Sequence, residues 1–377
     1  MTFNYVATTI PDIHFAGGIG ASLKDGRYTV LRKLGQGETS TIWLVSDSYV
    51  AGDTIHKYHA AKILGVKATS DPHGPSRERD FLQLCNERRH EEGFDEGAGY
   101  TTLLLDSFEH VGVSGRHLCL ISPVFSTSVA ALRDASPDKR LPVHMVRNIV
   151  YMALSALKSI HGMGIVHCDV KPDNMLFTND LFTDPTKLEA HLSQNPVQMV
   201  PGAQTPESQP LPHGWTHETS ADESKTMTIV LTDFGDAEQV GGPHLSKMLS
   251  TLDFCANATL LYPEHEPPSD IWALGHLTFE LLVGRSLLDS IDAARQLSTE
   301  EEQLRREGKG EKYFDQDGNL NCVPAELISN YNIAGLEDGD ITKVSDFIRA
   351  CMHLDLEQRP SAAQLLEHSF LEGASSC

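Results

Sequence analysis

Short apolar runs separated by polar turns dominate the first third of the chain. Residues 34–43 pass through a glycine turn and then resume with β-branched and aromatic residues, which predicts two strands joined by a hairpin. Residues 59–64 and 117–125 are apolar runs that predict two further strands, the second ending near Pro123. From 146 to 160 apolar residues recur every three or four positions, which predicts one long core helix. The pattern indicates a β-rich first part and a helical second part.

A second helix is predicted after the strand at 59–64. It begins near Pro75, with Ser76 as a candidate N-cap. Four residues at helical spacing follow: Glu78, Phe81, Leu82 and Cys85. The apolar members of this helix and of 146–160 are packing positions rather than a ligand site.

Chemically active side chains gather in residues 167–174, HCDVKPDN, and in residues 233–235, DFG. In a phosphoryl transfer the protein positions a hydroxyl, holds metal ions and neutralises phosphate charge. Asp169 can accept the hydroxyl proton, and Lys171 can meet the γ-phosphate. Asn174 and Asp233 offer the hard oxygen ligands that Mg²⁺ prefers. These residues therefore predict a phosphotransferase that uses ATP and Mg²⁺.

With these motifs in register, residues 24–372 resemble the eukaryotic protein kinase family, apart from one insertion. The resemblance implies an α+β, bilobal protein-kinase fold with a small β-rich N-lobe and a larger, mainly helical C-lobe. We expect an N-terminal extension, an N-lobe, a C-lobe and a C-terminal tail over residues 1–23, 24–124, 125–372 and 373–377. A further folded domain is not expected in 377 residues.

The resemblance places the nucleotide against the N-lobe. Gly35 and Gly37 let the backbone approach the phosphates, while Ser40 stands where many kinases have a third glycine. Ser122 corresponds to the gatekeeper that precedes the adenine-binding hinge. The residues expected to contact the nucleotide are Leu34, Gly35, Gly37, Ser40, Ile42, Ala60, Lys62, Ser122, Pro123, Val124 and Phe125.

Lys62, the one lysine of the strand at 59–64, is similar to the kinase lysine that contacts the α- and β-phosphates. Glu78 is the acid expected to pair with it, and Glu87, further along the same helix, is the alternative. Together with Asp169 and Lys171, Lys62 and Glu78 complete the expected catalytic set.

Later motifs carry structural roles in the family. Residues 262–264 (YPE) and 270–275 (DIWALG) resemble the end of the activation segment and the start of a central helix. Glu264 is expected to pair with Arg359, because burying either charge alone is costly. Asp270 is expected to brace the backbone of the catalytic loop rather than to do chemistry.

Longer strings resemble the SR-protein kinases within the family, namely residues 24–28, 32–37, 40–44 and 313–320. Cys168 agrees, since those kinases also lack the arginine that most kinases have at this position; we expect activity without a phosphorylated activation loop. Lys171 favours serine or threonine as the acceptor. The resemblance implies a serine/threonine kinase acting on proteins, with basic, Arg/Ser-rich splicing factors as candidate substrates.

An insertion at residues 179–225 separates the two catalytic motifs. It is rich in proline, serine, threonine and glutamine, which favours a mostly flexible loop with a short helix near 186–193. SR-protein kinases carry a spacer at the same point. A docking role for the insertion and a role as padding are equally open.

Two departures leave a second function open. Residues 236–264 contain no arginine, and Leu261 stands where SR-protein kinases usually have one. Glu264 and Asp270 also lie closer together than the family normally shows, so the peptide-binding platform is expected to be shortened. The alternative function is a pseudokinase-like scaffold that binds nucleotide and partner proteins without efficient transfer.

Charge and cysteine content bound the partners. The net charge is −22, from 30 basic and 52 acidic residues, which disfavours nucleic acid and suits a basic protein substrate, although acidity also serves solubility alone. The seven cysteines form no Cys-x-x-Cys pair, so neither a zinc site nor a disulfide framework is expected. Without a signal-like start or a run of 18 apolar residues, we expect a soluble intracellular monomer, in the cytoplasm, the nucleus or both, that does not enter a membrane.

Overall fold

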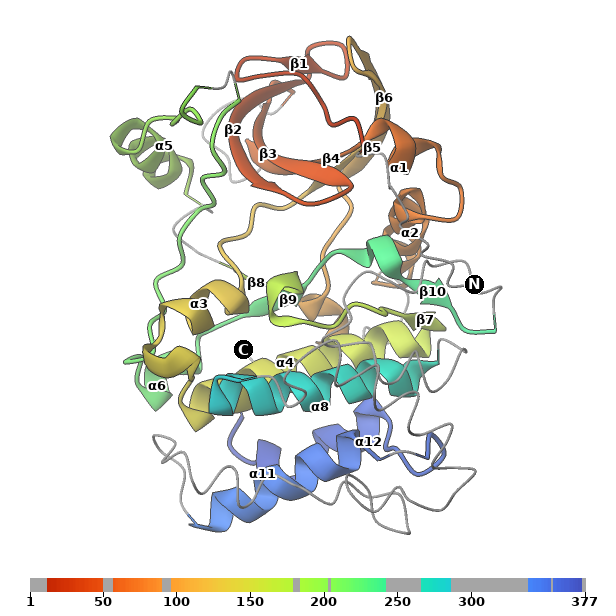
Figure 1. The fold of residues 1–377 in the computed structure, drawn as a ribbon, viewed down its shortest axis with the longest axis vertical. Coiled ribbons are helices and arrows are strands. Elements are labelled where there is room, and N and C mark those ends of the chain that lie inside the picture. The colour runs from red at the N-terminus through yellow and green to blue at the C-terminus, as the bar shows by residue number, and fades with distance from the viewer. Residues whose placement is uncertain are drawn as a thin grey trace, which may run out of the picture. The chain divides into compact units, whose positions relative to one another are not determined.

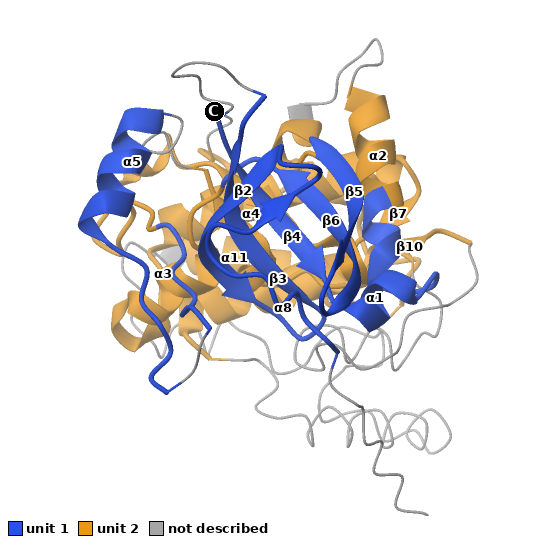
Figure 2. Cartoon of the chain, turned by 90° about the horizontal axis from the view of Figure 1, so that it is seen from above, with its two compact units in different colours: residues 1–79, 104–124, 180–211 blue, residues 80–103, 125–179, 212–377 orange. Residues whose placement is uncertain are grey.

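The computed structural model describes residues 12–49, 57–89, 96–178, 184–202, 205–241, 266–285, 338–353 and 355–374. The chain divides into two units (Figure 2). Unit 1 takes residues 1–79, 104–124 and 180–211, and unit 2 takes residues 80–103, 125–179 and 212–377. Unit 1 is built around a β-sheet and unit 2 is mainly helical, which confirms the expected α+β, bilobal kinase fold.

Unit 1 contains an antiparallel sheet in the order β1-β2-β3-β4-β6-β5 (Figure 1). Its strands are β1 (Ser22–Leu23), β2 (Tyr28–Gln36), β3 (Ser40–Asp47), β4 (Tyr58–Leu64), β5 (Asp106–Gly112) and β6 (Gly115–Ser122). The hairpin of β2 and β3 has the glycine turn at its tip, with Gln36 paired with Thr41. The predicted hairpin and the strand predicted at 59–64 are confirmed, and so is the strand predicted within 117–125, which ends at Ser122, next to Pro123.

The two faces of this sheet are covered differently, since side chains alternate along each strand. One face is a core that includes Trp43, Ile63 and Ile121, and Phe15 from the segment before β1 packs into it. Ile42 pairs with Lys62 across β3 and β4, so these two side chains share the opposite face. This opposite face carries the predicted nucleotide-binding residues.

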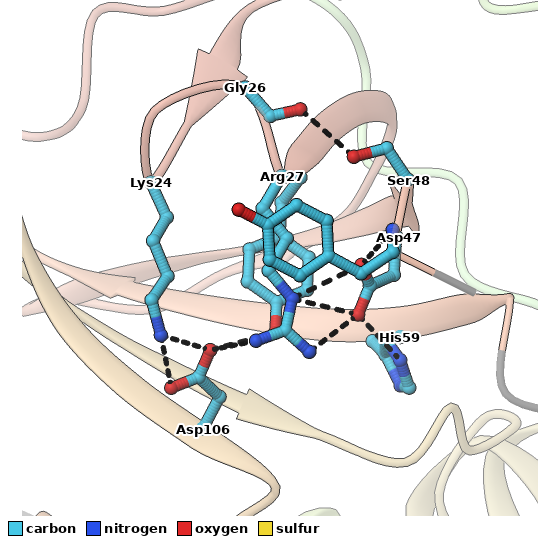
Figure 3. Close-up of polar contacts among 9 residues, drawn as sticks. Lys24, Gly26, Arg27, Asp47, Ser48, His59 and Asp106 are labelled. Carbon is cyan, nitrogen blue, oxygen red and sulfur yellow. Dashed lines mark hydrogen bonds and ion pairs between the residues drawn. The ribbon is translucent and has the colours of Figure 1, made fainter.

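In the string 24–28 (KDGRY), residues 24–27 form the turn between β1 and β2 and Tyr28 begins β2; the charged side chains of the turn anchor the sheet (Figure 3). Arg27 donates to Asp47 and Asp106, and the Lys24 ammonium lies 2.6 Å from Asp106. Burial raises the pKa of both carboxyl groups, but their hydrogen bonds to the basic residues outweigh it and hold both pKa values below the ordinary range. Residues 24–28, one of the strings that resemble the SR-protein kinases, therefore have a structural role in the sheet.

Three short elements connect β4 to the rest of the chain: α1 (Val66–Ser70), η1 (Pro75–Arg77) and α2 (Glu78–Arg89). The helix predicted here exists, but Ser76 is not its N-cap. The Ser76 hydroxyl instead donates to the Asp71 carbonyl, because a 3₁₀ turn precedes the α-helix and places Ser76 inside it.

The insertion is more ordered in shape than its composition suggested. It contains α5 (Pro185–Gln194), which covers the expected short helix, with the Asp184 carboxylate capping it at the Thr186 amide, 2.9 Å away. Leu188 and Leu211 are fully buried against Leu44 of β3 within unit 1. Figure 2 shows α5 coloured with the sheet of unit 1. The expectation of a mostly flexible loop is therefore wrong for the described part of the insertion, which contains a helix and packs against unit 1.

Unit 2 is organised around α4 (Val143–Gly162), whose predicted apolar stripe is buried along its whole length. It packs against α8 (Pro267–Val283) and α12 (Ala362–Leu366), and α11 (Asp338–Cys351) packs against α8. The remaining helices are α3 (Val129–Ala135), α6 (Ala221–Ser224), η2 (Glu96–Tyr100), η3 (Pro137–Lys139), η4 (Pro172–Asn174), η5 (Phe234–Asp236) and η7 (Ser369–Leu371). Within the described ranges, no helix has the length and apolar character needed to cross a membrane.

Candidate active site

Two short antiparallel ladders in unit 2 position the catalytic-loop motif. β7 (Ile165–Val166) pairs with β10 (Glu238–Gln239), and β8 (Met175–Phe177) pairs with β9 (Ile229–Leu231). The loop 167–174 lies between β7 and β8, and residues 233–235 follow β9. The Thr232 amide donates to the Asn174 carbonyl over 2.9 Å. Strand pairing thus brings together two motifs that are far apart in the sequence.

Asp169 is the centre of the loop and is 5% exposed. The Lys171 ammonium lies 2.6 Å from its Oδ2. The Asn174 side-chain amide donates to the same Oδ2 at 2.8 Å and to the Asp169 carbonyl at 2.9 Å. Three of the four catalytic and metal-binding residues predicted in unit 2 are therefore in direct contact.

Opposing effects act on Lys171. Burial lowers the pKa of its ammonium, but the negative charges of Asp169, Asp233 and Asp173 outweigh burial and leave the pKa above its ordinary value. Lys171 therefore stays charged, and the influence of Asp233 on it shows that the second motif reaches the same site.

The His167 side chain links the two motifs through hydrogen bonds. Its Nε2 contacts the Thr232 carbonyl, which can only accept, and its Nδ1 contacts the Asp169 amide, which can only donate, at 3.0 and 3.3 Å. The ring therefore donates from Nε2 to Thr232 and accepts at Nδ1 from Asp169. Its ring also meets the buried Phe234 edge-on, with centroids 4.9 Å apart. His167 is therefore a structural member of the loop.

Asp270, in the first turn of α8, holds the loop from beneath. Its carboxylate accepts the backbone amides of His167 and Cys168 at 2.8 and 2.9 Å, and His161 Nε2 lies 2.9 Å from it. Burial raises the pKa of this carboxyl group, but the hydrogen bond and charge of His161, with the contributions of His167, outweigh it and lower the pKa overall. The predicted bracing role of Asp270 is confirmed.

The backbone is left-handed at two positions of the site. Cys168 has φ 63° and Asp233 has φ 65°, a conformation that residues with a side chain adopt rarely. The Asp270 carboxylate fixes the first through its amide, and the β8–β9 ladder precedes the second. Such conformations concentrate at functional sites, where the surrounding structure imposes them.

The second group of predicted residues lies in unit 1. The Lys62 ammonium on β4 is 2.6 Å from Glu78 Oε2 at the start of α2, and both side chains are largely buried. Glu87, the alternative acid, is exposed on α2. The structure therefore pairs Lys62 with Glu78.

The remaining nucleotide candidates surround Lys62 on its strands and neighbours. Ala60 pairs with Ser122 across β4 and β6, and Lys62 pairs with Leu120, so all lie on one sheet face. The Ser122 hydroxyl donates to the Pro123 carbonyl at 3.3 Å. Gly35 and Gly37 have open space where a Cβ would be added or only distant neighbours. The candidates on these strands share one face, whereas Phe125 belongs to unit 2.

Sequence reasoning missed the neighbours that the insertion gives to this face. Leu34 and Val124, two predicted nucleotide residues, pack against the cluster of Leu44, Leu188 and Leu211. The only sequence signal was the apolar spacing of the leucines within a polar segment. The insertion therefore bounds one side of the residues expected to receive the nucleotide.

The predicted pair of Glu264 and Arg359 is only half visible, because residues 262–264 and also 313–320 lie outside the described residues. Arg359 is buried, donates to the Pro268 and His353 carbonyls, and lies over the Trp272 ring. These contacts tie the end of the chain to the start of α8. Among the described residues, no cluster of three or more His, Cys, Asp or Glu side chains could hold a metal ion.

Comparison with known proteins gives the family. Residues 28–371 match the model of the protein kinase domain. The serine/threonine-protein kinase SRPK of Physarum polycephalum is 25% identical over 91% of this chain and 85% of its own length. The serine/threonine-protein kinase SKY1 of Saccharomyces cerevisiae is 32% identical over 42% of this chain. The dual specificity protein kinase CLK2 of Homo sapiens is 22% identical over 95% of it.

The matched regions differ in what they cover. This chain spans only 20% of SKY1 and 66% of CLK2, so their full lengths hold segments beyond the similarity. The predicted resemblance to SR-protein kinases is nevertheless confirmed by the relatives found. Use of ATP and of a divalent metal is general in the family. The chain therefore belongs to the protein kinase family and is a serine/threonine protein kinase similar to the SR-protein kinases.

Proposed function

We propose that this protein transfers the γ-phosphate of ATP to serine or threonine hydroxyls of basic, Arg/Ser-rich proteins. The observation that carries the proposal is the catalytic loop, in which Asp169 contacts both Lys171 and Asn174 while Asp270 holds the backbone from beneath. These contacts hold the side chains of Asp169, Lys171 and Asn174 in one defined arrangement.

Asp169 is the group that accepts the proton of the substrate hydroxyl. The contacts with Lys171 and Asn174 hold its carboxylate in place, and Lys171 stays charged because its pKa is raised. Lys171 also offers its charge to the transferred phosphoryl group as negative charge develops there.

Asn174 and Asp233 are the candidate Mg²⁺ ligands. The Asn174 amide nitrogen is engaged with Asp169, which leaves the amide oxygen as the acceptor end of the side chain. Asp233 adds a carboxylate, so both donors are the hard oxygens that suit this metal. Bound with ATP, Mg²⁺ neutralises charge on the phosphates.

In unit 1, Lys62 would meet the α- and β-phosphates. Glu78 fixes the lysine from 2.6 Å, so the ammonium is oriented before the nucleotide arrives. The half-buried Ile42 and the buried Ala60 share its sheet face and offer an apolar surface for the base. These roles follow the resemblance and the shared face together.

The substrate class rests on the relatives and on charge. A chain with net charge −22 attracts basic peptides at long range, and the serine/threonine kinases it resembles include one named SRPK. We further propose that the protein acts as a monomer inside the cell and does not bind nucleic acid, in keeping with its acidity.

The test is Mg²⁺-dependent transfer of labelled phosphate from ATP to an Arg-Ser-repeat peptide and to a basic control protein. Asp169→Ala should abolish transfer, while Asp222→Ala, which removes an exposed carboxylate on α6, should leave it unchanged. Transfer to the control protein alone would refute the Arg/Ser assignment. ATP binding without transfer to either would refute catalysis and favour the scaffold.

A further inference from the structure

We propose that Asp12, in the segment before the kinase sheet, is a positioning residue for Glu78. Residues 12–21, here called the N-terminal strap, lie in unit 1 and precede β1. The inference rests on the proposed function, because it assigns the strap a part in holding the Lys62–Glu78 pair.

The strap caps the helix that follows the lysine strand. The Asp12 carboxylate accepts the Lys67 amide at 2.8 Å through Oδ1 and the Ala68 amide at 2.9 Å through Oδ2. The residue at the N-cap position of α1 is Gly65, which has no side chain to do this. A carboxylate from 55 positions away therefore takes the place of a local N-cap.

The close approach depends on the glycine. A Cβ added at Gly65 would lie 2.3 Å from the Asp12 carboxyl carbon, so any side chain there would displace the Asp12 carboxylate. The Val66 amide also donates to the Ile13 carbonyl at 3.0 Å. Strap and helix start thus fit as one unit.

An aromatic anchor holds the strap in register. Phe15 is 7% exposed and meets the rings of Trp43, His110 and His117 edge-on, with centroid separations of 6.1, 5.6 and 5.9 Å. These rings come from three strands of the sheet, so the anchor sits on the rigid core. Asp12 is three residues before Phe15, so the anchored ring fixes the position of Asp12 relative to α1.

The capped helix is part of the connection between Lys62 and Glu78. Lys62 lies on β4 just before α1, and Glu78 begins α2 just after η1. The Thr69 hydroxyl accepts the Leu118 amide at 2.8 Å, which fixes the other end of α1 to β6. The position of Glu78 thus depends on a short segment whose first turn is held by Asp12.

The decisive measurement is hydrogen–deuterium exchange of the amides at 66–79 in the full chain. Asp12→Ala should speed their exchange about fivefold, the factor that corresponds to the loss of one helix N-cap, and Asp12→Asn, which keeps one oxygen, should fall between it and the wild type. The matched control is Asp184→Ala, which uncaps α5 of the same unit and should leave 66–79 unchanged. Faster exchange confined to 66–70 would overturn the proposal.

Kinetics then separate positioning from a merely structural role. Asp12→Ala should lower kcat/KM for ATP about fivefold in the wild-type background and cause no further loss in a Glu78→Gln background. Independent, multiplying losses would overturn the proposal. If the wild type transfers no phosphate, the proposed function has failed, and the exchange measurement alone still decides the role of the strap.

Discussion

Replacing Asp270 with asparagine tests how the catalytic loop is held. The carboxylate is 1% exposed, and its two oxygens accept three hydrogen bonds, from the amides of His167 and Cys168 and from His161. Asparagine has nearly the same shape but only one oxygen. Its NH₂ group must therefore face at least one buried donor, whichever way the amide is turned.

The size of the effect follows from this mismatch. A buried donor left without a partner costs about 1–3 kcal/mol, and the remaining bonds also lose their charge assistance. We expect Asp270→Asn to lower the free energy of unfolding by about 3 kcal/mol. If the loop relaxes to relieve the mismatch, the loss of stability is smaller but Asp169, next to Cys168, is displaced and kcat falls.

The assay combines urea unfolding with steady-state kinetics. We expect kcat to fall by more than about tenfold, while KM for ATP changes by less than about threefold, because Lys62 and Glu78 in unit 1 are untouched. The matched control is Asp346→Asn on α11, an exposed carboxylate paired with Arg349. It should leave both measurements within error.

The acid limb of stability gives a second readout. The folded-state pKa of Asp270 is lowered, so its contribution is present above the ordinary aspartate value of about 3.9 and is lost as pH falls through the folded pKa. Asp270→Asn should therefore flatten the loss of stability below about pH 4. A variant with normal kcat, normal stability and an unchanged acid limb would refute the bracing argument.

Two further predictions concern packing and pH. His276 is fully buried and burial lowers its pKa to about 4, so the unfolded state binds its proton first and stability falls as pH drops from about 6.5 towards 4. This loss should reach about 3 kcal/mol and become shallower in His276→Gln, measured by urea unfolding at several pH values; an unchanged slope would contradict it. Leu188→Ala should lower the free energy of unfolding by about 3 kcal/mol and make the insertion more sensitive to limited proteolysis. Gln194→Ala, at an exposed position of the same helix, should change neither. Equal cleavage of the wild type and both variants would show that the insertion is not docked.

Local patterns predicted most of the fold and the chemistry of the site. The apolar runs that predicted strands at 59–64 and 117–125, and the spacing that predicted the helix at 146–160, depend only on neighbouring residues. The catalytic loop was readable for the same reason, since Asp169, Lys171 and Asn174 lie within six residues of each other. Even the brace at Asp270 followed from a motif that begins its own helix.

Contacts between distant segments were not predictable in this way. Nothing local to Asp12 indicates that it caps α1, because the signal at the helix start is a glycine without a side chain. Ser76 looked like an N-cap, yet the tertiary fold inserted a 3₁₀ turn and gave the hydroxyl another partner. Propensity describes what a segment can do alone, and packing then selects among the options.

The docking of the insertion also depends on contacts between distant segments, which its composition does not reveal. Proline and polar residues lower the apolar content of a segment, but docking requires only a few apolar residues at the right spacing on a surface that already exists. Leu188 on α5 and Leu211 beyond it supply two, and Leu44 belongs to a sheet that the rest of unit 1 holds together. The insertion also connects β8, which begins directly after Asn174, to β9, which ends directly before Thr232 and Asp233. The insertion, for which the sequence left docking and padding equally open, therefore follows β8 of unit 2 at one end and buries its leucines in unit 1, so its sequence is constrained by both.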